Sequence, residues 1–132
     1  MQLNFIMPTF ALQKIEAIKG KQEFEKLVVD GKCPFDEFEK GLEERDRKEM
    51  VGIYNSMQAI ADLRSLPYKK FHFYDEGENG VREFEFKSKN LRVYGITKKN
   101  GKIVIYGGTK ANQVHDSAEF RRIKNLFLSS LT

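Results

Sequence analysis

Cationic and proton-transferring side chains recur between residues 80 and 115 of this chain. Arg92 and Tyr94 are two positions apart in LRVYGI, so both would lie on one face of a β-strand. Lys110 and His115 follow the next apolar run. A guanidinium can hold a phosphate through two hydrogen bonds, and a histidine can donate or accept a proton near neutral pH. These residue types predict binding of a phosphate-rich ligand, with proton transfer at that ligand.

Further cations surround this group, and each also has a simpler explanation. Arg82 and Lys87 lie on the preceding apolar run, while Arg121 and Arg122 lie in the last charged segment. We take these four as candidate nucleic-acid-binding residues, because clustered basic side chains attract a polyanion. Alternatively, Lys87 is a solvated surface lysine, and Arg121 and Arg122 only solvate a helix. For Arg92 the alternative is an ion pair with a carboxylate of the neighbouring strand.

Positive charge is concentrated in the second half of the chain. The 132 residues have a formal net charge of +4 and a pI near 9.1. Residues 1–66 have a net charge of −2, and residues 67–132 a net charge of +6. Either one surface that faces a polyanion or ordinary surface solubility would explain this difference.

Several kinds of protein are disfavoured by what the sequence lacks. The one cysteine, Cys33, excludes an internal disulfide and fits a reducing cytosol, so we expect a cytoplasmic protein. No apolar run approaches the roughly 18 residues of a membrane span, and the first 20 residues make a poor signal peptide. His72 and His115 are far apart without metal-ligand spacing, and no glycine-rich phosphate loop is present. We therefore expect no metal and no cofactor.

A β-meander would position the candidate residues. The segments VREFEFKS, KNLRVYGITKK and KIVIYGGTKANQ follow one another with short connections, the second of which is an Asn-Gly turn. One face of this sheet is expected to pack on helices. The other face is expected to stay open to a ligand.

The rest of the chain predicts an α+β fold, in which an antiparallel twisted sheet of an N-terminal strand and a three- to four-strand meander packs against helices. The length predicts a single domain over residues 1–132. The other expected elements are a strand over 2–7 and a helix over 10–19, both ambiguous, a strand over 23–30, helices over 35–42 and 43–64, a short strand over 71–74, a polar turn over 75–80 and a last helix from 118 to about 128, capped by Asp116 or Ser117.

Five short segments occur in an order that resembles one protein family. GKCPFDEFEKGL resembles its helix opening, LRSLPYKKF its passage from helix into sheet, and VREFEFKS its first meander strand. LRVYGI and KIVIYGGTKANQ are similar to its next two strands, through Arg92, Val93, Tyr94, Gly101, Lys102, Gly107, Lys110 and Gln113. The family is the RelE/ParE superfamily of bacterial toxins, in particular its phage-derived HigB-like branch. The resemblance implies a RelE-like toxin domain over residues 23–128, preceded by an N-terminal extension over residues 1–22.

This resemblance implies the toxin of a toxin–antitoxin system. Members are mostly ribosome-dependent mRNA endonucleases or gyrase poisons, and an antitoxin protein covers their active face. Metal-independent cleavage by the 2′-OH of the RNA needs a base, cations beside the phosphate and an acid for the leaving 5′-oxygen. The expected catalytic residues are Arg92, Lys110, His115 and Tyr94, of which Arg92 and Lys110 are expected to contact the phosphate. The oligomeric state stays open.

Two departures from the family pattern favour other functions. Glu83 and Glu85 stand on the first meander strand where many catalytic members have basic residues, and Phe120 stands where some have a tyrosine or histidine in the last helix. A non-catalytic ParE-like toxin that binds gyrase, or a degenerate member that binds only a partner protein, is therefore the alternative. His115 would then be a loop histidine without a role, and Tyr94 a half-buried strand tyrosine.

Overall fold

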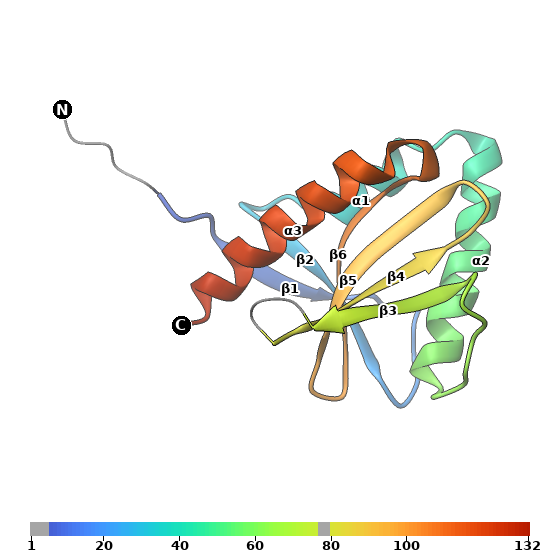
Figure 1. The fold of residues 1–132 in the computed structure, drawn as a ribbon, viewed down its shortest axis with the longest axis horizontal. Coiled ribbons are helices and arrows are strands. Elements are labelled where there is room, and N and C mark those ends of the chain that lie inside the picture. The colour runs from blue at the N-terminus through green and yellow to red at the C-terminus, as the bar shows by residue number, and fades with distance from the viewer. Residues whose placement is uncertain (1–5, 77–79) are drawn as a thin grey trace.

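The chain folds into one sheet that has helices on both of its faces (Figure 1). The computed structural model describes residues 6–76 and 80–132. The strands are β1 (Phe10–Lys14), β2 (Glu23–Val29), β3 (Phe71–Glu76), β4 (Arg82–Lys87), β5 (Leu91–Lys98) and β6 (Gly101–Thr109). The helices are α1 (Pro34–Lys40), α2 (Glu44–Ala61) and α3 (Gln113–Ser130), with a short 3₁₀ turn, η1 (Lys110–Asn112), before α3. The α+β class is confirmed, and none of the described helices has the length and apolar character needed to cross a membrane.

The sheet is mixed, so the prediction of a wholly antiparallel sheet is wrong. The strand order is β1-β2-β6-β5-β4-β3. The strands from β3 to β6 form the expected antiparallel meander, whereas β2 pairs with β6 in parallel, with Glu23 opposite Gly101. No hairpin joins β2 to β6, because two helices and three strands lie between them in the chain. The turn sequences therefore could not predict whether β2 and β6 run parallel or antiparallel.

Both faces of the sheet bury apolar side chains, which corrects the expected open face. On one face α1 and α2 cover a cluster that includes Phe24, Phe84 and Val93. On the other face α3 packs on β5 and β6, and Phe120 joins a second cluster that includes Ile96. The alternation along β5 therefore separates two cores rather than a core from solvent, as its nearly continuous burial shows.

The segment after residue 9 is a strand, so the helix expected over residues 10–19 is wrong. β1 pairs antiparallel with β2 and adds an edge strand to the sheet. Phe10 packs edge-on against Phe127 at 5.5 Å, and the residues after β1 bury Ile15 and Ile18 in the core under α2. Leu12, Ile15 and Ile18 have the three-residue spacing of a helix, but the pairing with β2 makes Phe10–Lys14 a strand, and Ile15 and Ile18 follow it. Of the strand expected over residues 2–7, residues 2–5 lie outside the described residues, and Ile6 and Met7 are in no strand.

The last helix begins five residues earlier than predicted. Asp116 is not its N-cap, because the helix starts at Gln113, directly after η1. The Asp116 carboxylate is buried and accepts hydrogen bonds from the backbone N–H of Thr109, at 3.3 Å, and from the side chain of Asn112, at 3.3 Å. Asp116 therefore ties α3 to the end of β6 instead of capping the helix. The expected turn over residues 75–80 lies partly outside the described residues, and β3 extends through residue 76.

Candidate nucleic-acid interface

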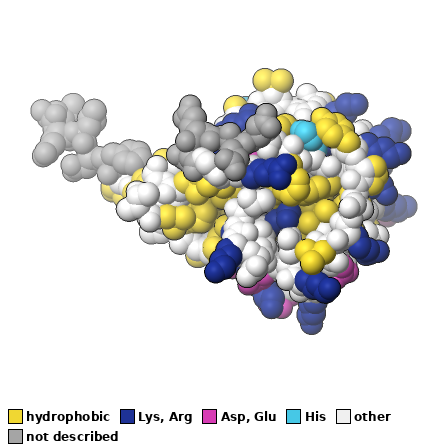
Figure 2. Space-filling model, turned by 60° about the horizontal axis from the view of Figure 1, so that its bottom comes forward, with side chains coloured by type: hydrophobic (Ala, Val, Ile, Leu, Met, Phe, Trp, Pro, Cys, Tyr) yellow, Lys and Arg dark blue, Asp and Glu magenta, His cyan; other side chains and the backbone are white. Residues whose placement is uncertain are grey.

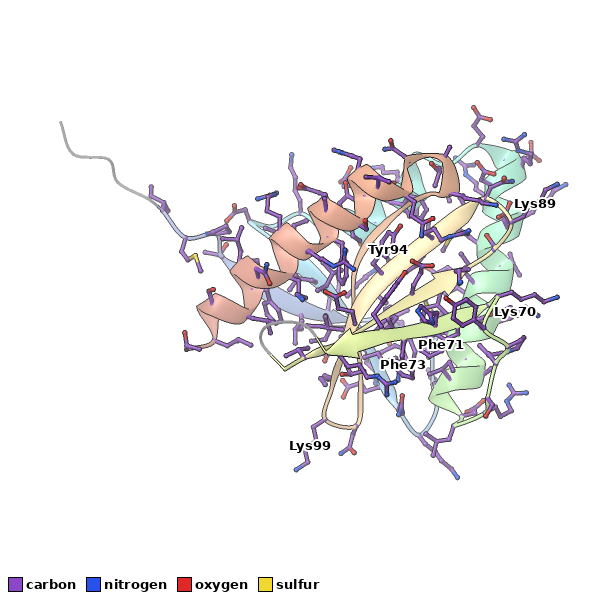
Figure 3. All side chains as sticks on the ribbon, in the orientation of Figure 1. Lys70, Phe71, Phe73, Lys89, Tyr94 and Lys99 are labelled. Atoms are coloured by element: carbon purple, nitrogen blue, oxygen red, sulfur yellow. The ribbon has the colours of Figure 1, made fainter. Side chains whose placement is uncertain are left out.

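The meander brings four strand ends to the same end of the sheet. In antiparallel strands the start of one lies beside the end of the next. The starts of β3 and β5 are therefore beside the ends of β4 and β6. Four of the residues just outside these ends are basic: Lys69, Lys70, Lys89 and Lys110. In Figure 3, Lys70 and Lys89 point outward on the side of α2, far from Lys99 at the opposite end of the sheet.

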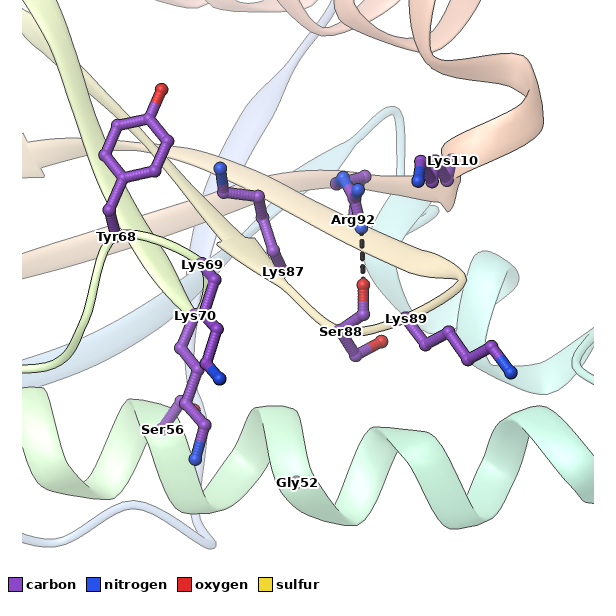
Figure 4. Close-up of a pocket in the computed structure, with 10 residues that line it drawn as sticks. All are labelled: Gly52, Ser56, Tyr68, Lys69, Lys70, Lys87, Ser88, Lys89, Arg92 and Lys110. Atoms are coloured by element: carbon purple, nitrogen blue, oxygen red, sulfur yellow. Dashed lines mark hydrogen bonds between the residues drawn. The ribbon is translucent and has the colours of Figure 1, made fainter.

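A cleft of about 610 Å³ opens at this end of the sheet, between the strand ends and α2 (Figure 4). It is lined by Gly52, Ser56, Tyr68, Lys69, Lys70, Lys87, Ser88, Lys89, Arg92 and Lys110. Six of these ten residues are lysine or arginine, and none of the described lining residues is acidic. Lysine and arginine side chains also crowd the right-hand side of Figure 2. We call the cleft with these ten lining residues the basic cleft. A cleft with one sign of charge concentrates the potential and attracts ions of the opposite sign.

Arg92 forms part of the wall of the basic cleft and is held there by fixed contacts. Its Nη1 donates hydrogen bonds to the backbone carbonyls of Ser88, at 2.6 Å, and of Leu91, at 2.8 Å. Its Nε lies 3.7 Å from Oε1 of Glu85 on β4, the strand beside it. The ion pair with a neighbouring strand is thus present, and the same guanidinium borders the cleft. An arginine fixed in this way can meet a phosphate without first losing side-chain entropy.

The two glutamates of β4 are buried ion-pair partners, and neither lines the basic cleft. Glu85 accepts hydrogen bonds from the Tyr74 hydroxyl, at 2.5 Å, and from Nε2 of Gln113, at 3.3 Å. Glu83 pairs with Arg121 at 3.1 Å and with Lys124 at 2.6 Å. These carboxylates therefore neutralise cations inside the protein instead of repelling a polyanion at its surface.

Lys87 and Lys110 complete the set of predicted residues that meet in the cleft. The Lys110 side chain is exposed, and its backbone N–H donates to the carbonyl of Asn90 at 2.8 Å, which ties η1 to the β4–β5 turn. The Lys87 ammonium lies 4.1 Å from the centre of the Tyr68 ring, a cation–π contact. Of the predicted site residues, the structure brings Arg92, Lys110 and Lys87 together in this cleft.

The two residues predicted to transfer protons lie elsewhere. His115 is exposed on α3, near enough to Glu119 for its charge to help lower the pKa of that carboxyl, after the larger effect of Arg122. Tyr94 is 1% exposed and stacks on Phe120 at 5.5 Å. Burial and then the charge of Glu85 raise the pKa of the Tyr94 phenol, so it stays protonated. Neither side chain lines the basic cleft.

The other predicted cations make local contacts. Arg82 lies over the Phe73 ring at 4.1 Å. Arg121 is paired with Glu83, and Arg122 is paired with Glu119. None of these three arginines lines the basic cleft.

Several lining residues were not among the sequence candidates. Gly52 and Ser56 belong to α2, and the other five lie at the strand ends: Tyr68, Lys69, Lys70, Ser88 and Lys89. The signal that marks them is local clustering of an aromatic residue with lysines in PYKKF and of lysines in KSKN. Such clusters are common on surfaces. These residues line one cleft because the strand ends beside them meet at the same end of the sheet.

Glu49 of α2 fixes the turn that forms one wall of the cleft. Its carboxylate accepts hydrogen bonds from the Ser88 hydroxyl, from the Asn90 backbone N–H at 2.5 Å, and from the Asn90 side chain at 3.2 Å. Burial would raise the pKa of Glu49, but these hydrogen bonds outweigh it and lower that pKa. The ionised form is thus preferred in the folded protein.

Replacing Glu49 with glutamine is expected to lower the free energy of unfolding at pH 7 by about 1–2 kcal/mol, because charge-assisted hydrogen bonds are lost. A carboxyl group whose pKa is lowered by folding stabilises the folded state at pH values above its pKa in the unfolded chain. This stabilisation is lost as the pH falls through the lower pKa of the folded state. The difference in the free energy of unfolding between wild type and Glu49→Gln should therefore become smaller as the pH falls below about 4. Urea unfolding of the two proteins at pH 7 and pH 3 measures this difference at each pH. The exposed Glu44→Gln is the control, and an unchanged gap at pH 3 would contradict the assignment.

Comparison of the chain with protein-family models, with curated proteins and with solved structures finds no match. The resemblance to RelE/ParE toxins therefore rests on the short motifs alone. The case for a function rests on the basic cleft.

Proposed function

We propose that this chain is the toxin of a toxin–antitoxin system, of the HigB-like RelE type, and that it cleaves mRNA on the ribosome without a metal ion. One observation supports this most: Arg92, Lys87 and Lys110 meet in a cleft whose described lining contains no carboxylate. A phosphodiester chain is the cytoplasmic polyanion that such a cleft fits.

In the proposed reaction the cleft holds the scissile phosphate. Arg92, fixed by two backbone carbonyls, and the exposed Lys110 ammonium lie where negative charge develops as the 2′-OH attacks. Stabilising this charge lowers the barrier, because preorganised cations need no reorganisation at the moment of reaction. The 2′-oxygen bonds to phosphorus and its proton passes to a water molecule. The bond between phosphorus and the 5′-oxygen then breaks, and the leaving oxygen takes a proton.

The acid that protonates the 5′-oxygen is assigned within the cleft, since His115 and Tyr94 lie outside it. Among the described lining residues, the groups that can exchange protons are the lysine amines and the Tyr68 phenol. An ammonium of Lys87 or Lys110 is therefore our candidate for the acid that protonates the 5′-oxygen.

The order of elements also supports a RelE-like domain. From residue 24 to residue 128 the chain runs through a strand, two helices, a four-strand meander and a helix, and the quoted motifs fall on α1, on the passage from α2 into β3, and on β4, β5 and β6. β1 is an addition at the sheet edge beside β2. The N-terminal extension thus enlarges the sheet.

A second candidate function is a non-catalytic toxin that binds gyrase, or a degenerate member that binds only a partner protein. The observation that favours it is the position of His115 and Tyr94 away from the cleft. In that case the basic cleft would bind a polyanion without cutting it.

Primer extension on bacterial mRNA after induction of the chain tests the proposal. Wild type is expected to give cuts in phase with codons. Lys110→Ala should reduce cutting by about tenfold to a hundredfold, because one cation is lost from the developing charge. Lys99→Ala, an exposed lysine at the far end of the sheet, is the matched control and should cut like wild type.

Arg92 needs a separate variant, because its burial means that alanine would disturb the fold. Arg92→Lys keeps the charge and loses the planar guanidinium that the carbonyls of Ser88 and Leu91 hold in place, so it should cut poorly while its thermal unfolding stays cooperative. Growth arrest with intact mRNA would refute cleavage, and inhibition of supercoiling would then indicate gyrase. Copurification of a small protein from an adjoining reading frame would test the proposed antitoxin.

A further inference from the structure

Tyr68 separates the basic cleft from a second, smaller hollow. This hollow has a volume of about 420 Å³ and is lined by Ile60, Arg64, Ser65, Leu66, Tyr68, Phe71, His72 and Phe73. Its volume falls within the roughly 300–1,000 Å³ of small-ligand pockets, and its walls are mostly apolar or aromatic. Tyr68 lines both hollows, so a ligand of the basic cleft that reaches past this ring enters the second one.

A row of rings extends from Tyr68 along the outer edge of the sheet. Tyr68 and His72 have ring centroids 4.3 Å apart, and His72 and Tyr74 have centroids 4.5 Å apart. Tyr68 is 65% exposed, so part of its ring is open to a ligand from solvent. The Lys87 ammonium lies over the same ring, so a negative charge is attracted to the side of the ring that faces the cleft.

The strand behind these rings presents unpaired backbone groups. β3 is an edge strand, paired only with β4. The N–H of Lys87 donates to the carbonyl of Lys70, and Phe71 is opposite Phe86 in this register. Backbone groups point alternately toward and away from the partner strand, so those of Phe73 point outward, to the edge that lines the second hollow. They offer a donor and an acceptor beside the aromatic walls.

We propose that this second hollow binds a nucleobase of single-stranded RNA whose phosphate lies in the basic cleft. The inference rests on the proposed function and names its substrate as unpaired RNA. Stacking on exposed aromatic rings beside a cationic groove is how proteins hold unpaired nucleotides. A base stacked on Tyr68 could bond through its polar edge to the strand edge. A peptide strand added to β3 would use the same edge, but it would not explain the lysines around Tyr68.

Tyr68→Trp gives a direct readout, since the chain contains no tryptophan. An octauridylate should quench the fluorescence of this single indole through stacking. An abasic ribose-phosphate chain with the same number of phosphates should leave it unchanged. Leu131→Trp, at the end of α3, is the matched control, because Leu131 is 66% exposed and neither oligomer should quench an indole there.

Affinities measured by anisotropy separate this inference from the proposed function. Wild type should bind labelled octauridylate about tenfold more tightly than the abasic chain. Tyr68→Ala should remove that difference, and Tyr68→Phe should keep it. Lys110→Ala should weaken binding of both oligomers by a similar factor, because it acts on phosphate.

Each other outcome overturns something specific. Equal wild-type affinity for the two oligomers, with no quenching of the indole in Tyr68→Trp, would refute the base site and leave the proposed function standing. If neither oligomer binds, both the basic cleft as a phosphate site and this inference fail. If Tyr68→Ala weakens only the binding of a copurifying protein, the edge belongs to a peptide and the inference is wrong.

Discussion

Replacing Glu83 with glutamine is expected to lower the free energy of unfolding by about 3–5 kcal/mol. Glu83 is 4% exposed and is the carboxylate partner of both Arg121 and Lys124. Lys124 is itself 4% exposed, so the substitution leaves an ammonium buried without its countercharge. Urea unfolding at pH 7, followed by circular dichroism, measures the difference.

A pair of controls shows whether burial causes this effect. Glu119→Gln breaks the more exposed pair with Arg122 and should change stability by no more than about 1 kcal/mol. Replacing both Glu83 and Lys124 with methionine removes the two buried charges together and should recover most of the loss. A cost below about 1 kcal/mol for Glu83→Gln would contradict the prediction, because it would show that the buried ion pairs of Glu83 are not needed for the fold.

The meander was predictable because its signals are local. Alternation in LRVYGI and the Asn-Gly turn set the register of β5 and β6, and the register of β5 with β4 places Arg92 opposite Lys87 and within 3.7 Å of Glu85. The long amphipathic helix was expected over residues 43–64 and is observed as α2, Glu44–Ala61. Both rest on periodicities that a short window of sequence contains.

What the sequence could not show depends on contacts between distant segments. The parallel pairing of β2 with β6 joins residues about 80 positions apart, and β1 is a strand because β2 is there to pair with it. Strand alternation correctly placed Arg92 and Tyr94 on one face, but α3 covers that face at Tyr94 and leaves Arg92 at the cleft. The packing of α3 therefore separates two residues that the pattern alone treats as equivalent.

Lys102 gives the second large prediction. It is 4% exposed on β6, donates to Oε1 of Gln22 at 2.7 Å and lies 5.5 Å from the centre of the Phe73 ring. No ion pair joins it to a carboxylate among the described residues. Burial, and then the charge of Arg82, lower the pKa of Lys102 to about 8. The charged form is thus disfavoured inside the fold.

Lys102→Met is expected to raise the free energy of unfolding at pH 7 by about 3 kcal/mol, since methionine fills a similar volume without a charge to desolvate. Because the folded pKa lies below the unfolded value of 10.5, the unfolded chain binds more protons between these values. Wild type therefore gains stability as the pH rises from 8, and the advantage of the variant should fall to about 1 kcal/mol by pH 10. Urea unfolding of both proteins from pH 7 to pH 10 measures this convergence, with exposed Lys99→Met as the control. A constant difference in the free energy of unfolding across that range would mean that the charge on Lys102 does not destabilise the fold. Gln22 and water would then solvate its ammonium within the fold.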